Sequence, residues 1–300
     1  MANEVVLAPQ ASSLKPQADF IGERREVLDT PVPLTIHRPL TTPKGQVVLL
    51  PGWSGTRCGP ADLLVLLATR LAQNGWEALR LDLPGRGDAG GEFQATDLDS
   101  MISAAAQAVD AHAKAPLVLL GICSGANVAL GVASLLKPQA SSPKPSVGVI
   151  AFSALPFQAT RTAGFDRRRR WANLRNYAKK ALSPSTWSRL LRGEINIDRV
   201  KKNVSVAEKP ADGERNLKDS SRDIERDLLD WKGPALFIWG SGDEEAAPSR
   251  AHFEKLHAKG MGSTNQTTFH TIEGANHNFY SLAWREELCQ RVLAFVSGQS

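Results

Sequence analysis

Two side chains that could act as nucleophiles stand next to each other in the segment LLGICSGANVAL: the thiol of Cys123 and the hydroxyl of Ser124. A sharp turn from a strand into a helix can present such a group when small residues lie two positions before it and two positions after it. Gly121 and Gly125 flank Cys123 at this spacing, whereas the β-branched Ile122 lies two positions before Ser124. The spacing therefore predicts that Cys123 is the nucleophile of an enzyme.

The segments on either side of Cys123 support this prediction. The apolar PLVLL before the turn predicts a strand, and ANVAL after it predicts a helix. A helix that begins beside the sulfur lowers the pKa of the thiol through the field at its N-terminal end. The alternative is that Cys123 is a buried apolar cysteine, as many free cysteines are. We favour the nucleophile because the glycines and the strand-to-helix context occur together.

A nucleophile of this kind needs a general base and an acidic group that orients the base. The segment EGANHNFYS places His277 in a loop after the last expected strand, which suits a general base. The segment GSGDEEAAP places Asp243 after an earlier strand, in the order nucleophile, acid, histidine. Glu244 and Glu245 are alternative acids, and the cluster could instead only cap a helix. The other histidines fall within expected strands or helices, where a packed or solvated role is favoured: His37, His112, His252, His257 and His270.

Backbone N–H groups that stabilise an oxyanion are expected from two places. One is the residue after the nucleophile, here Ser124, and the other is the loop after the first parallel strand. In that loop, LLPGWSG, the N–H of Trp53 is the favoured donor and that of Ser54 is the alternative. The loop could also be an ordinary glycine-rich turn. A second such segment, DLPGRGDAGG, predicts a structural turn that borders the site.

Short apolar runs alternate with helical patterns along most of the chain. Nearly continuous apolar strands separated by helices are typical of a mostly parallel sheet with helices on both faces, so the predicted fold class is α/β. In an open sheet of this class, ligands bind at the edge where the strands end. The strands expected from the sequence are residues 46–52, 77–85, 116–122, 147–155, 234–240 and 267–274.

The alternation is interrupted once. Between Pro156 and Asp230 the patterns are helical only, and this segment has 18 Lys and Arg residues against 11 Asp and Glu. An insertion at this point would lie over the edge of the sheet that holds the site. The sequence therefore predicts a flexible N-terminal leader (1–22), a first core part (23–155), a basic helical cap (156–230) and a second core part (231–300).

The composition is that of an ordinary globular chain, with 42% hydrophobic and 22% charged residues. The first residues lack the basic region and apolar stretch of a secretory signal, and no segment has the roughly 18 apolar residues of a membrane span. A cytoplasmic protein is therefore expected. The three cysteines are too few and wrongly spaced for a disulfide framework or a zinc site: Cys58, Cys123 and Cys289.

The segments PGWSG, DLPGRGD, GICSGA, GSGD and GANHNF together resemble the α/β-hydrolase superfamily over residues 46–296. The cysteine departs from the usual serine and is similar to that of dienelactone hydrolases and, more distantly, of polyhydroxyalkanoate synthases. The segment RRWANLRNYAKKALSPSTWSRLLRGEI is similar to the hydrolases associated with bacterial exosortase systems.

The resemblance implies an α/β-hydrolase fold, in which a mostly parallel sheet is flanked by helices and carries an inserted helical cap. It implies hydrolysis of a carboxylic ester, thioester or lactone through a thioester on Cys123, with no metal or organic cofactor. His277 and Asp243 would complete the triad, and the oxyanion would accept hydrogen bonds from Trp53 and Ser124.

Two alternatives to hydrolysis stay open. An acyltransferase would pass the acyl group of the same Cys123 thioester to an alcohol or an amine. A protein of another class would bind a membrane surface or, as the less favoured case, nucleic acid through residues 167–170 with Trp171 and Tyr177.

The expected partner is a small-molecule or carrier-linked acyl substrate. We predict that Arg168 and Arg169 of the basic cap favour an anionic one, because a cleft lined by one sign of charge concentrates ligands of the opposite sign. The oligomeric state is left open by the sequence.

Overall fold

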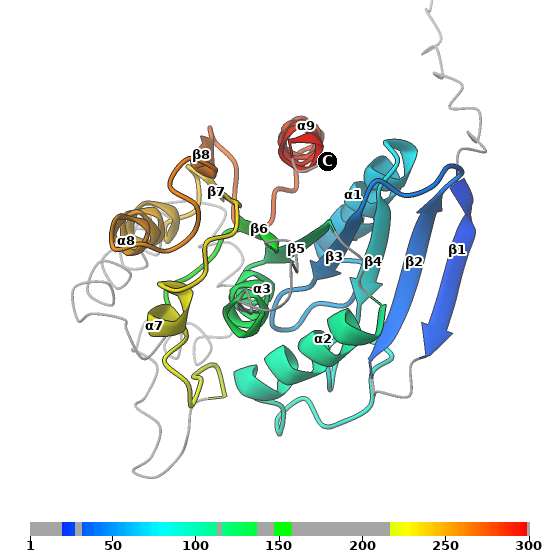
Figure 1. Cartoon of the computed structure of the whole chain (residues 1–300), viewed down its shortest axis with the longest axis horizontal. Coiled ribbons are helices and arrows are strands. Elements are labelled where there is room, and N and C mark those ends of the chain that lie inside the picture. Colours follow the sequence, from blue (N-terminus) through cyan, green and yellow to red (C-terminus); the bar gives the residue numbers. More distant parts are fainter. Residues whose placement is uncertain (1–19, 28–31, 113–115, 137–146, 158–216, 299–300) are drawn as a thin grey trace, which may run out of the picture.

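The computed structural model describes residues 20–27, 32–112, 116–136, 147–157 and 217–298. Within these residues, eight strands form one sheet in the order β1-β2-β4-β3-β5-β6-β7-β8 (Figure 1). The pairings are parallel, except that β2 runs antiparallel to both β1 and β4. The strands are β1 (Phe20–Val27), β2 (Pro33–Pro39), β3 (Gln46–Leu50), β4 (Glu77–Leu81), β5 (Leu117–Ile122), β6 (Gly148–Phe152), β7 (Ala235–Gly240) and β8 (Thr267–Ile272).

Helices cover both faces of the sheet (Figure 1). One face carries α1 (Leu63–Gln73), which follows the short 3-10 helix η1 (Pro60–Asp62), and α9 (Leu282–Ser297). The other face carries α2 (Leu98–His112), α3 (Ser124–Leu135), α7 (Ile224–Leu228) and α8 (Ala246–Ala258). The central strands β3 to β7 are therefore shielded from water on both sides.

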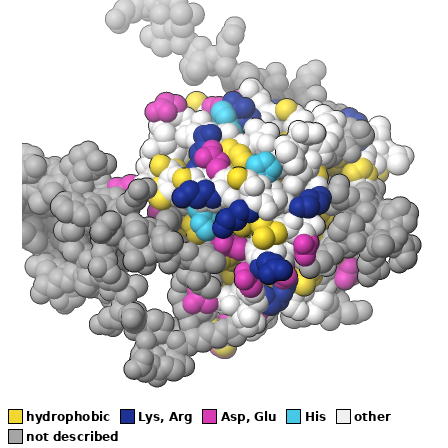
Figure 2. Space-filling view, turned by 60° about the vertical axis from the view of Figure 1, so that its left-hand side comes forward, with side chains coloured by type: hydrophobic (Ala, Val, Ile, Leu, Met, Phe, Trp, Pro, Cys, Tyr) yellow, Lys and Arg dark blue, Asp and Glu magenta, His cyan; other side chains and the backbone are white. Residues whose placement is uncertain are grey.

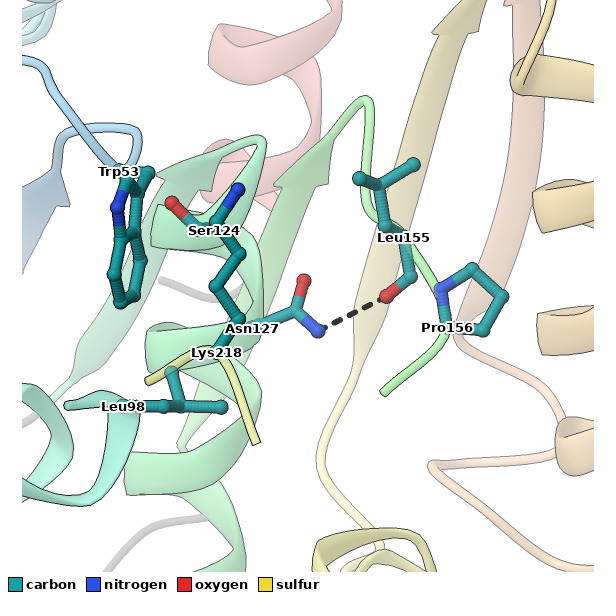
Figure 3. A pocket seen from close by; sticks show the side chains of 7 residues that line it. All are labelled: Trp53, Leu98, Ser124, Asn127, Leu155, Pro156 and Lys218. Atoms are coloured by element: carbon teal, nitrogen blue, oxygen red, sulfur yellow. Dashed lines mark hydrogen bonds between the residues drawn. The ribbon is translucent and has the colours of Figure 1, made fainter. Parts of the chain in front are cut away.

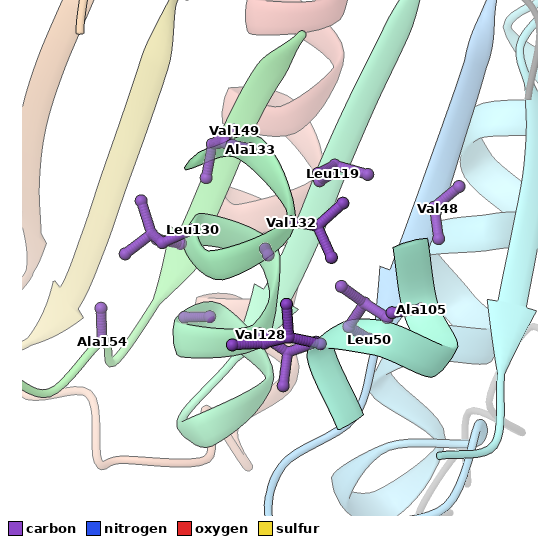
Figure 4. Close-up of a cluster of buried hydrophobic side chains, with 14 of the residues drawn as sticks. Val48, Leu50, Ala105, Leu119, Val128, Leu130, Val132, Ala133, Val149 and Ala154 are labelled. Carbon is purple, nitrogen blue, oxygen red and sulfur yellow. The ribbon is translucent and has the colours of Figure 1, made fainter. Parts of the chain in front are cut away.

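Successive side chains of the parallel strands enter the two cores in turn, because side chains alternate between the faces of a sheet. In β3, Val48 and Leu50 join the core that includes α2 and α3, whereas Val47 and Leu49 join the core that includes α1 and α9. Figure 4 shows the first of these cores, in which Val128 of α3 lies among side chains from the sheet and from α2. Every residue of β3 is buried, which explains its continuous apolar sequence.

The predicted α/β class and the six predicted strands are confirmed, and these strands are β3 to β8. The sequence did not predict β1 and β2. β1 begins at Phe20, inside the residues assigned to a flexible leader (1–22). β2 has the sequence PLTIHRP, in which prolines at both ends and the buried polar residues Thr35 and His37 conceal the strand pattern.

The predicted cap falls mostly on residues 158–216, which lie outside the described residues, so its boundaries and the division into domains stay predictions. The structure does describe residues 217–230. There Ile224 and Leu228, both in α7, are buried in the core that also contains α3. Asp99 at the start of α2 accepts hydrogen bonds from the Ser220 and Ser221 hydroxyls at 2.5 and 2.6 Å.

The parallel strands place their carboxyl ends along one edge of the sheet, and the loops that follow β3, β5, β7 and β8 contain the residues singled out by the sequence. Among the helices that the structure describes, none combines the length and the apolar character needed to cross a membrane.

Candidate active site

Cys123 lies in the turn between the end of β5 and the start of α3, with φ 56° and ψ −124°. A positive φ is uncommon for a residue with a side chain and costs about 1–3 kcal/mol unless the surroundings hold it. Here the Cys123 N–H donates to the carbonyl of Phe152 at the end of β6 over 2.8 Å, and the Cys123 carbonyl accepts from the Ala126 N–H over 3.0 Å. These two hydrogen bonds, to Phe152 and from Ala126, fix the turn that presents the sulfur.

The two glycines that flank Cys123 are required by close backbone contacts. A Cβ on Gly121 would lie 2.1 Å from the carbonyl oxygen of Gly125. A Cβ on Gly125 would lie 2.3 Å from the carbonyl oxygen of Leu50 at the end of β3. Separations this short are excluded by steric repulsion, so the turn has the small residues at the positions where the sequence analysis expects them.

His277 and Asp243 come together from two separate loops. Asp243 follows β7, and His277 follows β8. Nδ1 of His277 and Oδ2 of Asp243 are 2.6 Å apart. The Ser153 hydroxyl donates to the His277 carbonyl over 2.9 Å and holds the backbone of this loop against β6. The geometry thus selects Asp243 over its neighbour Glu244, which is exposed.

His277 and the Cys123 thiol shift the pKa of each other through their side chains, which links them with Asp243 in a relay of three side chains. Burial alone would raise the pKa of the thiol, but the hydrogen bond and charge of His277, the Ser124 N–H and the charge of Lys218 lower it below its ordinary value. Burial would lower the pKa of His277, but the hydrogen bonds to Asp243 and Cys123 raise it to about 10. These directions favour a thiolate beside an imidazolium.

The two expected oxyanion donors border the same pocket. Trp53 follows β3 in a turn that is closed by a 2.9 Å hydrogen bond from the Gly55 N–H to the Gly52 carbonyl. A Cβ on Gly52 would lie 3.5 Å from the Cβ of Cys123, so this loop passes directly beside the nucleophile. Trp53 and Ser124 both line the adjacent pocket, whereas Ser54 is exposed.

Arg86 holds the loop that contains Trp53, a role that the sequence analysis missed. Its Nε donates to the Trp53 carbonyl, and its guanidinium carbon lies 4.7 Å from the ring centroid of Trp53 and 4.6 Å from that of Phe93. Arg86 is only 4% exposed. The segment DLPGRGD indicated a turn beside the site, but nothing in the sequence links it to Trp53.

The fully buried Asp82 connects the turn DLPGRGD to the loop after Trp53. One Asp82 oxygen accepts from the Arg57 N–H at 2.6 Å, and the other accepts from the Arg57 guanidinium and, at 3.0 Å, from the Asp88 N–H. A Cβ on Gly87, whose φ is +56°, would lie 2.3 Å from the Asp82 carboxyl carbon. The charged network thus ties the segment DLPGRGD to the chain that follows Trp53.

A pocket adjoins the relay on the side of α3 (Figure 3). About 330 Å³ of free space lies within it, part of which is open solvent. Lys218 lies at this pocket with its Nζ 5.4 Å from the Trp53 ring centroid. The residues that line the pocket are Trp53, Leu98, Ser124, Asn127, Leu155, Pro156 and Lys218.

The other cysteines and histidines stand apart from the relay. Cys289 of α9 is buried, which raises the pKa of its thiol to about 11, and Cys58 is half-buried in the loop before η1. His270 faces Glu287 at 2.8 Å, and His37 accepts a hydrogen bond from Arg80 at 2.9 Å.

Arg168 and Arg169 lie outside the described residues, so their proposed contact with substrate stays a prediction. The same is true of the segment that resembles exosortase-associated hydrolases. Within the described ranges, no group of three or more His, Cys, Asp or Glu side chains is arranged to hold a metal ion.

Comparison with known proteins identifies the family of the chain. Residues 47–291 match the model of the alpha/beta hydrolase family. A search of curated protein sequences gave no match.

Solved structures share the fold at low sequence identity. Mouse alpha/beta hydrolase domain-containing protein 10 is 14% identical, with 93% of this chain and 100% of that chain covered and a TM-score of 0.61. A dienelactone hydrolase from Anabaena variabilis is 15% identical, with 92% and 98% covered and a TM-score of 0.56. An esterase from Pyrococcus furiosus is 16% identical, with 93% and 91% covered and a TM-score of 0.57.

Proposed function

The chain belongs to the α/β-hydrolase family, and from this premise we propose that it hydrolyses an ester-type bond with Cys123 as its nucleophile. The observation that carries the proposal is the relay in which His277 contacts both the thiol of Cys123 and, at 2.6 Å, the carboxylate of Asp243. The substrate class would be a carboxylic ester, a thioester or a lactone. An esterase and a dienelactone hydrolase among the structural neighbours support this choice.

In the first half of the proposed reaction, the Cys123 thiolate attacks the carbonyl carbon of the ester and a carbon–sulfur bond forms. The carbonyl oxygen becomes an oxyanion, which accepts hydrogen bonds from the N–H groups of Ser124 and Trp53. The carbon–oxygen bond to the leaving group then breaks, and the imidazolium of His277 gives its proton to the departing oxygen. The acyl group remains on Cys123 as a thioester.

In the second half, His277 takes a proton from a water molecule, whose oxygen attacks the thioester carbonyl. The carbon–sulfur bond breaks, the carboxylic acid leaves, and Cys123 and His277 return to the thiolate and imidazolium forms. Asp243 keeps Nδ1 of His277 protonated throughout, so that Nε2 faces the reacting atoms.

The test compares one labelling experiment with the kinetics of three variants. Limiting iodoacetamide should modify Cys123 ahead of Cys58 and Cys289, as mapped by peptide mass. Turnover of p-nitrophenyl esters of graded chain length should be lost in His277→Ala and should fall roughly a thousandfold or more in Asp243→Asn, because the imidazole loses its orientation.

The control is His270→Ala, which removes a histidine that faces Glu287 instead of the relay and should change turnover by less than about twofold. Preferential labelling of Cys58 or Cys289 would show that Cys123 is not the nucleophile. Full activity of Asp243→Asn would show that the relay does not need its acid.

Acyl transfer is the second candidate, because a thioester on Cys123 can react with an alcohol or an amine as well as with water. Product analysis with and without added acceptors separates the two reactions. Free carboxylic acid as the main product at every acceptor concentration supports hydrolysis, and a transferred ester or amide as the main product supports an acyltransferase.

A further inference from the structure

The side-chain amide oxygen of Asn127, Oδ1, is buried and has no hydrogen-bond partner among the described residues. Nδ2 of the same amide donates to the Leu155 carbonyl over 2.9 Å. Because a carbonyl oxygen can only accept, this bond fixes which end of the amide is nitrogen. Oδ1 therefore faces the opposite way, in a residue that is only 7% exposed.

The unpaired oxygen belongs to the pocket beside the relay. Ser124 and Asn127 are three residues apart in α3, so they share one face of the helix, and both line the pocket. In Figure 3 the Asn127 nitrogen points to the Leu155 carbonyl, and its oxygen points into the space between Ser124 and Leu155. The acceptor is thus directed into the volume next to the nucleophile.

Four of the other six residues that line the pocket are apolar. Leu98, Leu155 and Pro156 line it together with the ring of Trp53. A buried acceptor without a donor is unfavourable, and apolar walls offer no replacement for the water that it gives up. A ligand that brings a donor to this point would remove the penalty.

We propose that the pocket takes an acyl group that carries a hydroxyl, and that this hydroxyl donates to Oδ1 of Asn127. The proposal rests on the proposed function, because the acyl group enters the pocket as an ester that is attacked by Cys123. Lys218 lines the same pocket and disfavours a cationic donor such as an ammonium group, so a neutral hydroxyl fits better.

The helix sets the position of this hydroxyl along the acyl chain. Asn127 follows Cys123 by four residues, and a helix rises about 1.5 Å per residue, so the Cα of Asn127 lies about 6 Å farther along the axis of α3. Side chains of a helix lean toward its N-terminus, which brings the Asn127 side chain back toward the nucleophile. The hydroxyl should therefore be a few bonds away from the carbonyl carbon. Asn127 would act as a specificity-determining residue.

The experiment compares p-nitrophenyl hexanoate with its 2-hydroxy, 3-hydroxy and 6-hydroxy derivatives on the whole protein. One hydroxylated ester should have a kcat/KM about tenfold above that of hexanoate, the size expected for one hydrogen bond to a buried acceptor. The corresponding methoxy ester, which keeps the oxygen but lacks the donor, should lose this advantage. This comparison needs no variant and does not depend on how a substitution folds.

The kcat/KM of the favoured hydroxylated ester is then divided by that of hexanoate in Asn127→Leu, where this ratio should fall to about one. The matched control is Gln107→Leu, which replaces an exposed amide on α2 and should leave the ratio unchanged. Equal kcat/KM for all hydroxylated esters and hexanoate in the unchanged protein would overturn the proposal and leave the hydrolase standing. A methoxy ester as good as the hydroxy ester would overturn it as well. If no ester is turned over and iodoacetamide spares Cys123, both proposals fall.

Discussion

Cys123 combines a strained backbone with a side chain whose charged form is stabilised. Its φ of 56° is held by hydrogen bonds to Phe152 at the end of β6 and to Ala126 in α3, and the charge of His277 lowers the pKa of its thiol. His277 is in turn held by Asp243. At this scale the chemistry depends on the proton shared by the sulfur and the imidazole, so it should respond to pH.

A plot of kcat/KM against pH should be bell-shaped, with a decline on the acid side and another on the alkaline side. The pKa of the Cys123 thiol is lowered by His277, so the thiolate is lost only when the pH falls below the ordinary thiol range. The pKa of His277 is raised to about 10, so the proton needed by the leaving group is lost as the pH rises through that value. The measurement is kcat/KM for an alkyl ester between about pH 5 and about pH 11, a range wide enough to include both limbs.

Alkylation of Cys123 by iodoacetamide provides the comparison, since it needs the thiolate but not the proton of His277. Its rate should fall on the acid side only and stay constant where catalysis declines on the alkaline side. In His277→Ala the acid limb should move to higher pH. An alkylation rate that rises through the ordinary thiol range in the unchanged protein would contradict the stabilised pair.

At the scale of elements, the turn between β5 and α3 and the loop after β3 must pass each other at backbone contact distance. Gly121, Gly125 and Gly52 line this passage. The loop after β3 is then held on its other side by Arg86, which bonds the Trp53 carbonyl. Two substitutions separate the steric requirement from the hydrogen-bonded one.

Gly121→Ala should destabilise the fold and abolish activity, because its Cβ would lie 2.1 Å from a backbone oxygen that cannot move aside. Overpacking of this kind costs about 1–3 kcal/mol or more of the free energy of unfolding. Gly90→Ala is the matched control, because no atom lies within 4 Å of its Cβ, and it should change that free energy by about 0.5 kcal/mol or less. Urea unfolding measures both, and equal effects would show that the close contact at Gly121 does not matter.

Arg86→Met keeps an apolar stem but removes the hydrogen bond to the Trp53 carbonyl, so the oxyanion donors should lose their alignment. We expect kcat to fall by about tenfold to a hundredfold, with little change in KM or in the alkylation rate of Cys123. Arg86→Lys should restore only part of kcat, because an ammonium lacks the flat guanidinium that lies near the rings of both Trp53 and Phe93.

The control for these two variants is Arg291→Met on α9, which should leave kcat, KM and the alkylation rate of Cys123 unchanged. Equal losses in kcat and in alkylation rate would indicate general disruption of the fold. An unchanged kcat in Arg86→Met would show that the oxyanion donors do not depend on this arginine.

At the scale of the whole molecule, charge is unevenly distributed along a chain with a net charge of +5. Residues 156–230 contain 18 basic and 11 acidic residues, so the excess is concentrated there. On the face of the described chain shown in Figure 2, basic and acidic side chains are interspersed. Lys218, from the end of the basic segment, lies at the pocket beside Ser124.

If this charge selects substrates, kcat/KM for a carboxylated ester should fall as salt is added, while that of a neutral ester of the same length should not. Screening acts over about 10 Å at 0.1 M salt. Lys218→Met should raise KM for the carboxylated ester by about threefold to tenfold, and Arg168→Glu with Arg169→Glu should raise it further. Lys255→Met, on the exposed side of α8, is the control and should have no effect. Equal salt dependence for the two esters would show that these cations only face solvent.

The sequence by itself determined the features that depend on neighbours along the chain. The turn at Cys123 needs a small residue at Gly121 because the backbone meets Gly125 four residues later, and that requirement is visible as a spacing. Gly125 has the same spacing, although the atoms that exclude a side chain there belong to Leu50 and Pro51. The strands β3 to β7 were predictable because all of their residues are buried and most are apolar. β8 is only partly buried and has the mixed sequence TTFHTI. The positions of His277 and Asp243 followed from loops after such strands.

Only the tertiary structure decided which side chains meet across long separations. The contact with His277 at 2.6 Å distinguishes Asp243 from Glu244 and Glu245, which follow it directly in sequence. Arg86 reaches Trp53, 33 residues away, because the loops after β3 and β4 emerge beside each other at one edge of the sheet.

The edge strands and the unpaired oxygen of Asn127 are also products of the tertiary structure. β1 and β2 carry mixed polar sequences, and they form a sheet edge only because β4 offers them a partner. Asn127 looks like any polar residue in a helix until Leu155 takes its nitrogen and apolar walls enclose its oxygen. Such contacts depend on strand register and on how the layers pack, which no short stretch of sequence specifies.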